Sequence, residues 1–73
     1  MKTDIIVKVK IGSLKRSIEN FGENRYLIKT DFVKDEDVNK DVIFMLSKYM
    51  GVPPNRFQLI NGFDKEDKIF KIV

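Results

Sequence analysis

The chain of 73 residues contains no cysteine, no histidine and no tryptophan. Without cysteine it has neither disulfides nor thiolate metal sites, so packing alone must hold the fold together. Without histidine and cysteine it lacks the side chains that most often act as bases and nucleophiles near neutral pH. Its glycines also form no phosphate-binding loop pattern. We therefore expect a protein that is not an enzyme, with no catalytic residue, no bound metal and no cofactor.

Long apolar runs are missing as well. Near the N-terminus only residues 5–7 are continuously apolar, far short of the roughly 20 residues that cross a bilayer. We expect a cytoplasmic monomer with no membrane partner and a single domain over residues 1–73. The net charge of +3, from 14 basic and 11 acidic residues, is too small to indicate a polyanionic partner by itself. Only the distribution of the charged residues over the surface can indicate one.

Residues 35–51 have the clearest helical periodicity. The segment begins with three acidic residues, which suit the positive end of a helix dipole, and ends at a glycine that two prolines soon follow. At 100° per residue one face collects apolar side chains, which we expect to cover a sheet. These side chains are Val38, Val42, Met45, Leu46 and Tyr49.

Alternation of apolar and polar residues predicts strands over residues 4–10, 25–30, 56–60 and 68–72. We expect the first two strands to pair antiparallel, with residues 11–24 as a long connection that includes a turn of helix. Asn61 and Gly62 predict a turn in the last hairpin. The predicted architecture is α+β in two layers, a β-β-α-β-β sheet of about four strands with one main helix on one face.

The two-residue period of the strands predicts that basic side chains gather on the sheet face away from the helix. The predicted set is Lys8, Lys10, Arg25, Lys29 and Lys71. Such a face can follow a phosphate backbone, which predicts weak nucleic-acid or polyanion binding. The alternative is an outer face that lysines keep solvated and free of edge-to-edge association. Aromatic residues point inward, so the face lacks the stacking platform of single-strand readers.

Phe44 departs from the amphipathic pattern of the helix. It lies opposite the apolar stripe, and Ile43 lies nearer the border of that stripe. An exposed ring at this position predicts a protein-protein interaction module that docks through Ile43 and Phe44. The alternative is that another part of the chain folds over the ring.

Three segments together resemble the YggU-like family, small domains whose biochemical function is not established. They are IGSLKRSI after the first strand, LSKYMGVP at the helix end and FQLINGFDKEDK in the last hairpin. The resemblance spans nearly the whole chain and implies the same β-β-α-β-β sheet, often with an additional short helix. It carries over three family-motif positions, which are Asn39, Gly62 and Lys68.

An ordinary structural role is the alternative to a binding role at each of these positions. Asn39 is expected to hold the loop that enters the helix, Gly62 to adopt positive φ, and Lys68 to pair with Asp64 or Glu66. Family members usually carry an arginine where this chain has Glu66, and the exchange of a cation for an anion weakens any anion site in that loop.

A ubiquitin-like fold is the alternative architecture. Residues 49–68 resemble the segment that follows the helix in that fold, in which a Pro-Pro turn leads to a short strand. The long connection between the first two predicted strands does not match the tight first hairpin of that fold.

Overall fold

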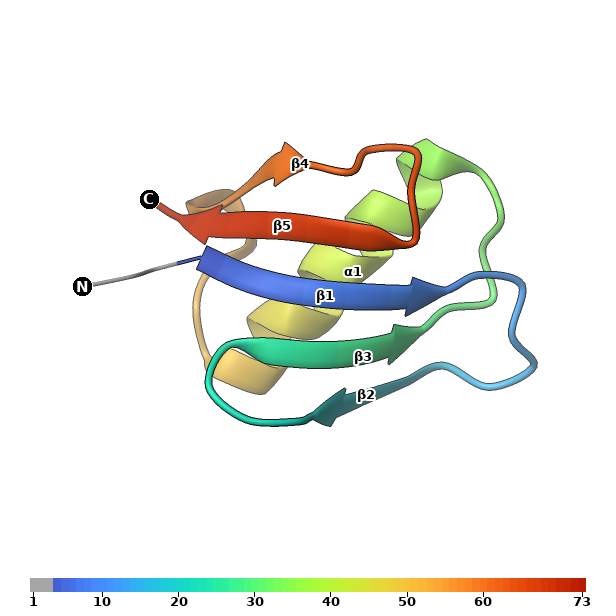
Figure 1. Cartoon of the computed structure of the whole chain (residues 1–73), viewed down its shortest axis with the longest axis horizontal. Helices are drawn as coiled ribbons and strands as arrows, with labels where there is room; N and C mark the ends of the chain where they lie inside the picture. Colours follow the sequence, from blue (N-terminus) through green and yellow to red (C-terminus); the bar gives the residue numbers. More distant parts are fainter. Residues whose placement is uncertain (1–3) are drawn as a thin grey trace.

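A computed structural model describes residues 4–73 and contains five strands and one main helix (Figure 1). The predicted α+β class, with the main helix on one face of the sheet, is confirmed, although the sheet has five strands rather than four. Residues 1–3 of the predicted domain lie outside the described residues. The elements in order are β1 (Asp4–Lys10), β2 (Ser17–Asn20), β3 (Arg25–Lys29), α1 (Asp35–Met50), a 3₁₀ turn (Pro54–Arg56), β4 (Phe57–Asn61) and β5 (Asp67–Ile72).

The sheet has the order β2-β3-β1-β5-β4, and α1 crosses behind it in the view of Figure 1. β1 and β3 are parallel, with Val7 opposite Tyr26, so the predicted antiparallel pairing of these segments is wrong. The predicted turn of helix after residue 11 is also wrong, because this part of the chain forms β2 and returns along the outer side of β3. Since β3 separates β1 from β2, the tight first hairpin of a ubiquitin-like fold is absent.

The core lies between the sheet and α1, as the alternating pattern predicts. On the helix, Val38, Val42 and Leu46 are buried, whereas Tyr49 is 54% exposed. Burial extends instead to the polar residues Asn39 and Asp41 on the two borders of the stripe. The side chains that the sheet contributes to the buried core are Ile5, Val7, Val9, Tyr26, Ile28, Phe57 and Phe70.

The ends of α1 follow local backbone chemistry. Gly51 has φ 71°, and its N–H donates to the Ser47 carbonyl at 2.9 Å, which is the usual left-handed stop at a helix C-terminus. At the other end Lys34 is the N-cap residue and makes no side-chain capping bond. The acidic first turn therefore acts through the helix dipole. Among residues 4–73 no helix is long and apolar enough to span a bilayer.

Candidate functional site

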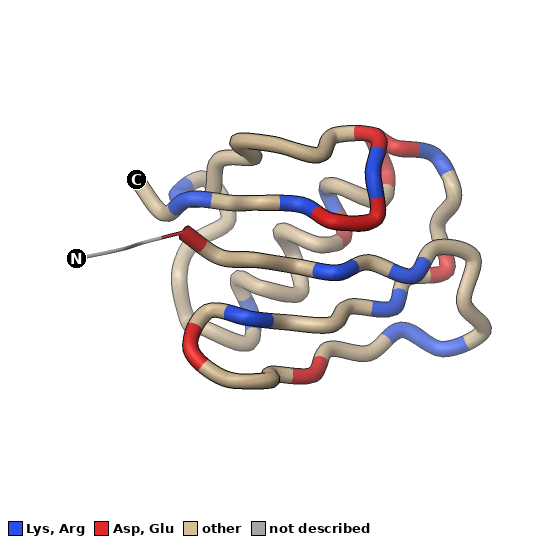
Figure 2. Tube along the Cα trace, in the orientation of Figure 1, with Lys and Arg blue, Asp and Glu red and all other residues tan. Residues whose placement is uncertain are grey.

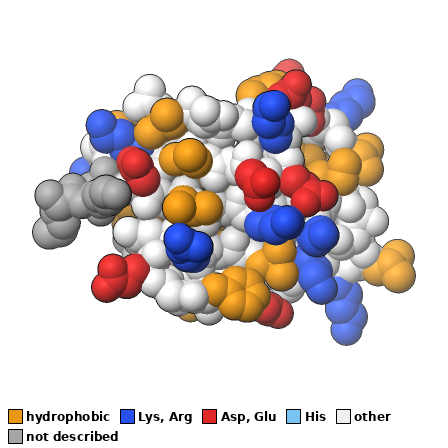
Figure 3. Space-filling view, viewed as in Figure 1, with side chains coloured by type: hydrophobic (Ala, Val, Ile, Leu, Met, Phe, Trp, Pro, Cys, Tyr) orange, Lys and Arg blue, Asp and Glu red, His pale blue; other side chains and the backbone are white. Residues whose placement is uncertain are grey.

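All five predicted basic side chains are exposed, and the strand register places them on the open face, the sheet face that α1 does not cover. Acidic residues interrupt this face, as the mixed colours of Figure 3 show. Lys8 lies opposite Asp67 and has its Nζ 3.9 Å from Glu66, and Lys71 lies opposite Asp4. The structure therefore does not make one continuous basic surface of the five residues.

The positive charge is concentrated at one end of the open face. Lys10 and Lys29 end the parallel strands β1 and β3 and lie directly opposite each other. They line a shallow hollow together with Lys15 from the loop after β1. Figure 2 shows these basic segments side by side at the right of the view. We call Lys10, Lys15 and Lys29 the basic end.

The basic end carries charge that the described part of the chain does not neutralise. The ion pairs among residues 4–73 are Lys8 with Glu66 and Arg16 with Asp41, and neither involves the basic end. Leu14, which lines the same hollow, is fully exposed at 103% of its reference area. The hollow thus combines three cations with aliphatic side chains and contains no aromatic ring.

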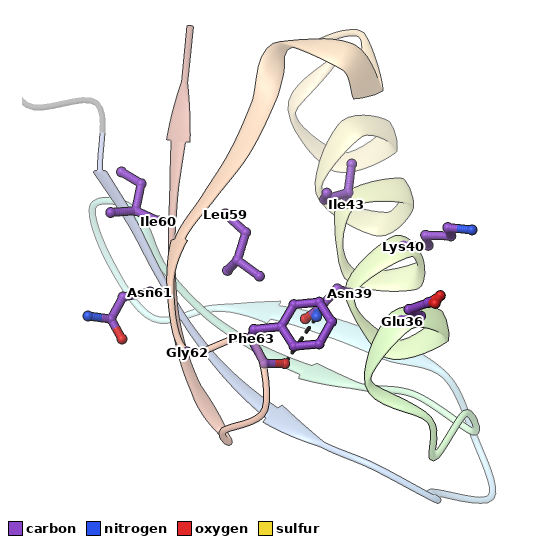
Figure 4. A pocket seen from close by; sticks show the side chains of 9 residues that line it. All are labelled: Glu36, Asn39, Lys40, Ile43, Leu59, Ile60, Asn61, Gly62 and Phe63. Atoms are coloured by element: carbon purple, nitrogen blue, oxygen red, sulfur yellow. Dashed lines mark hydrogen bonds between the residues drawn. The ribbon is translucent and has the colours of Figure 1, made fainter.

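The three family-motif positions meet in one buried cluster, although they are far apart in sequence. Lys68 is 2% exposed, and its Nζ donates to the carbonyl oxygens of Gly62 at 2.8 Å and Phe63 at 2.9 Å. Asn39 Nδ2 donates to the same Phe63 carbonyl at 3.0 Å (Figure 4). We call these four residues the Lys68 cluster. It holds the loop between β4 and β5 against the start of α1.

The electrostatics of the Lys68 cluster follow from its burial. Desolvation lowers the pKa of Lys68, and the carboxylates of Asp35 and Asp64 partly oppose this effect. The hydrogen-bond partners of Lys68 are carbonyls rather than the expected Asp64 or Glu66 side chains. Within residues 4–73 the Oδ1 atom of Asn39 is buried without a hydrogen-bond partner. The hydrogen bonds of Lys68 and Asn39 fix the loop between β4 and β5.

Gly62 is required by the geometry of this loop. Its φ is +88°, and a Cβ atom at this position would lie 2.2 Å from the carbonyl oxygen of Asp67. No side chain fits so close to backbone, because real Cβ contacts of this length do not occur. The expected positive φ is present, and close approach of the two strand ends is a second reason for glycine.

A second polar cluster, in which Asp41 and Thr30 are buried and Arg16 is exposed, was not predicted from the sequence. Asp41 accepts hydrogen bonds from Thr30 Oγ1 at 2.7 Å and from Arg16 Nε at 3.2 Å, and Arg16 Nη2 donates to its other oxygen. The hydrogen bonds from Arg16 to Asp41, and then the negative charge of Asp41, raise the pKa of Arg16. We call Arg16, Thr30 and Asp41 the Asp41 cluster. It joins the loop before β2 to α1. Arg16 is therefore already ion-paired within the protein.

The predicted docking pair Ile43 and Phe44 does not form one surface. Ile43 is half-buried, packs against the core and lines a hollow between α1 and β4 (Figure 4). Phe44 is 46% exposed and lines a different hollow between α1 and β2. The predicted exposure of Phe44 is thus present in the structure, whereas Ile43 faces the other flank of the helix.

Comparison with known proteins adds no further constraint on this site. No protein-family model matches the chain, so the resemblance to the YggU-like family stays a prediction. Within residues 4–73 no three acidic, histidine or cysteine side chains are grouped so as to hold a metal ion. The expectations of a non-enzyme, a cytoplasmic location and a monomeric state also stay predictions.

Proposed function

We propose that the protein is a binding module that holds a polyanion, such as a nucleic-acid backbone, against its basic end. The observation that supports this function is the direct opposition of Lys10 and Lys29 on neighbouring strands, with Lys15 on the same hollow. Like charges directly opposite each other destabilise a sheet, and a phosphate chain between them would remove that cost. The other cations of the open face have acidic neighbours or lie at its far end.

The surroundings of the basic end indicate which property of the polyanion is recognised. Ile11 and Leu14 line the hollow, and these aliphatic side chains offer no ring on which a base can stack. Backbone phosphates rather than bases are the expected contacts, so binding should not depend on base sequence. Three lysine contacts to a single strand correspond to a slope of about −2 in a plot of log K against log salt concentration.

The test is fluorescence polarisation with a labelled single-stranded oligonucleotide between about 50 and 200 mM salt, the range over which phosphate contacts lose strength. Lys10→Glu with Lys29→Glu should abolish binding. Arg25→Glu with Lys71→Glu changes the net charge equally at the other end of the open face and should retain most of the affinity. Equal loss in both double variants would show that net charge alone drives association, and a flat salt dependence would exclude the polyanion site.

A further inference from the structure

The flank of α1 that faces β2 carries a second surface, separate from the basic end. A hollow of about 410 Å³ lies between the helix and this strand, within the size range of ligand pockets. We call it the α1/β2 groove. Its lining residues are Arg16, Ile18, Phe44, Met45, Lys48 and Tyr49.

The floor of the groove is apolar and belongs to the edge of the core. Ile18 and Met45 are half-buried and pack against the core cluster. Phe44 and Tyr49 rise on the helix side, each about half exposed. The ring of Tyr49 is held by an edge-to-face contact with buried Tyr26 at a centroid distance of 5.5 Å. The aromatic side of the groove is therefore in contact with the core through Tyr49.

The strand beside the groove has a free edge. β2 is the terminal strand of the sheet and pairs only with β3 among the described strands. The N–H of Phe21 donates to the Arg25 carbonyl, and hydrogen-bonded pairs alternate along an antiparallel ladder. By this alternation the backbone groups of Ile18 and Asn20 point away from β3, where another strand can pair with them.

The charges around the groove have one sign. Lys48 Nζ lies 5.1 Å from the centre of the Phe44 ring on one side, and the Arg16 guanidinium lies 5.9 Å from it. No acidic residue lines the groove, although Arg16 forms an ion pair with Asp41 outside its lining. Lys48 has no ion-pair partner among residues 4–73. Lys48 therefore supplies the positive charge at the rim that is complementary to a negatively charged ligand.

We propose that the α1/β2 groove binds an extended, acidic peptide segment of a partner protein. The segment pairs with the free edge of β2, places aliphatic side chains over Ile18 and against Phe44, and directs carboxylates toward Lys48. Main-chain pairing supplies affinity in this mode, and the pockets for alternate side chains supply specificity. A free strand edge selects a polypeptide over a nucleic acid, because only a polypeptide can continue the ladder.

The first experiment uses a fluorescein-labelled octapeptide of four alternating isoleucine and valine residues followed by four glutamates. We expect at least tenfold weaker binding when lysines replace the glutamates, and equally weak binding when proline interrupts the apolar run. Phe44→Ser should reduce affinity at least tenfold. Phe63→Ser is the matched control, because Phe63 is 52% exposed on the opposite flank of α1 and should leave affinity unchanged.

A charge exchange distinguishes specific binding in the groove from non-specific adsorption of the peptide and from loss of folding. Lys48→Glu should weaken the glutamate peptide and strengthen the lysine peptide, whereas Lys40→Glu should change neither beyond twofold. Thermal unfolding by circular dichroism checks that each variant is folded. The proposal would be overturned if peptide affinity changed neither with the proline nor with Phe44→Ser. It would also be overturned if sedimentation showed a dimer that Phe44→Ser dissociates. Binding of the oligonucleotide at the basic end should survive Phe44→Ser, so the two surfaces can fail independently.

Discussion

The Asp41 and Lys68 clusters hold loops against opposite flanks of α1, but the charged groups in them have different partners. In the Asp41 cluster a carboxylate meets a guanidinium and a hydroxyl, so opposite charges are in direct contact. In the Lys68 cluster an ammonium meets only backbone carbonyls and is almost fully buried. The first cluster depends on both charges, whereas the second buries a cation whose main partners are neutral. We therefore expect the two loops to respond differently to the loss of one charge.

The largest effect is expected from Asp41→Ala. The variant removes a charge-assisted pair with Arg16 and leaves the Thr30 hydroxyl buried without an acceptor, which together should cost about 2 to 3 kcal/mol in the free energy of unfolding. Urea denaturation followed by circular dichroism measures the change. Lys40→Ala, at an exposed position of the same helix, is the control and should stay within about 0.5 kcal/mol of the parent. Equal stability of the two variants would show that the cluster contributes nothing.

The next largest effect tests the shared carbonyl of the Lys68 cluster. Phe63 accepts from both Asn39 and Lys68, so Asn39→Ala alone leaves it one donor and should cost about 1 kcal/mol. In the Lys68→Met background the same change leaves this carbonyl unpaired and should cost about 2 kcal/mol. A double-mutant cycle in urea gives the coupling directly. Strict additivity would mean that the two donors do not share one acceptor in solution.

Lys68→Met alone should have a smaller effect, at most about 1 kcal/mol. The Phe63 carbonyl keeps Asn39 as a donor, and the Gly62 carbonyl keeps the N–H of Lys65 at 3.1 Å. Methionine also fills most of the volume of the lysine stem and removes the cost of a buried charge. The measurement is the urea midpoint, with Lys71→Met on the exposed face of β5 as the control. A loss above about 3 kcal/mol, the scale of a broken buried ion pair, would show that the ammonium is essential to the loop.

These clusters also show what the sequence can and cannot reveal. Strand periodicity alone places Lys68 on the same face as Phe70, so its burial was readable from the sequence, although its carbonyl partners were not. The exposed ring of Phe44 follows from helical periodicity in the same way. The Asp41 cluster was not readable, because Arg16 lies 25 residues away and no local pattern joins the two. Contacts at that separation depend on the topology of the sheet.

The topology was mispredicted for a specific reason. β2 is four residues long, and only Ile18 in it is apolar, so it has too little alternation to be recognised as a strand. If β2 is overlooked, the closeness of β1 and β3 in sequence favours an antiparallel pair. Because β2 is present, the chain reverses direction twice between β1 and β3, and the two strands are parallel. The helix and the other strands were predicted to within about one residue, because their periodic segments are longer. The α1/β2 groove could not be predicted, since one of its walls is the strand that was missed.

The smallest expected effect concerns the pH dependence of the Lys68 cluster. Desolvation lowers the pKa of Lys68 in the folded protein, whereas in the unfolded chain it stays near its ordinary value of about 10.4. Between the two values the unfolded chain binds more protons at this residue, so the free energy of unfolding should rise with pH in that window. Below the window Lys68 is protonated in both states, and the cost of the buried ammonium is constant.

Lys68→Met lacks this titration. The free energy of unfolding of the parent relative to the variant should therefore increase as pH approaches about 10.4. The contributions of the other lysines and the tyrosines cancel in this difference. A difference that stays flat or falls with pH would mean that the ammonium is as well stabilised by its carbonyls as Arg16 is by Asp41, and the contrast between the two clusters would disappear.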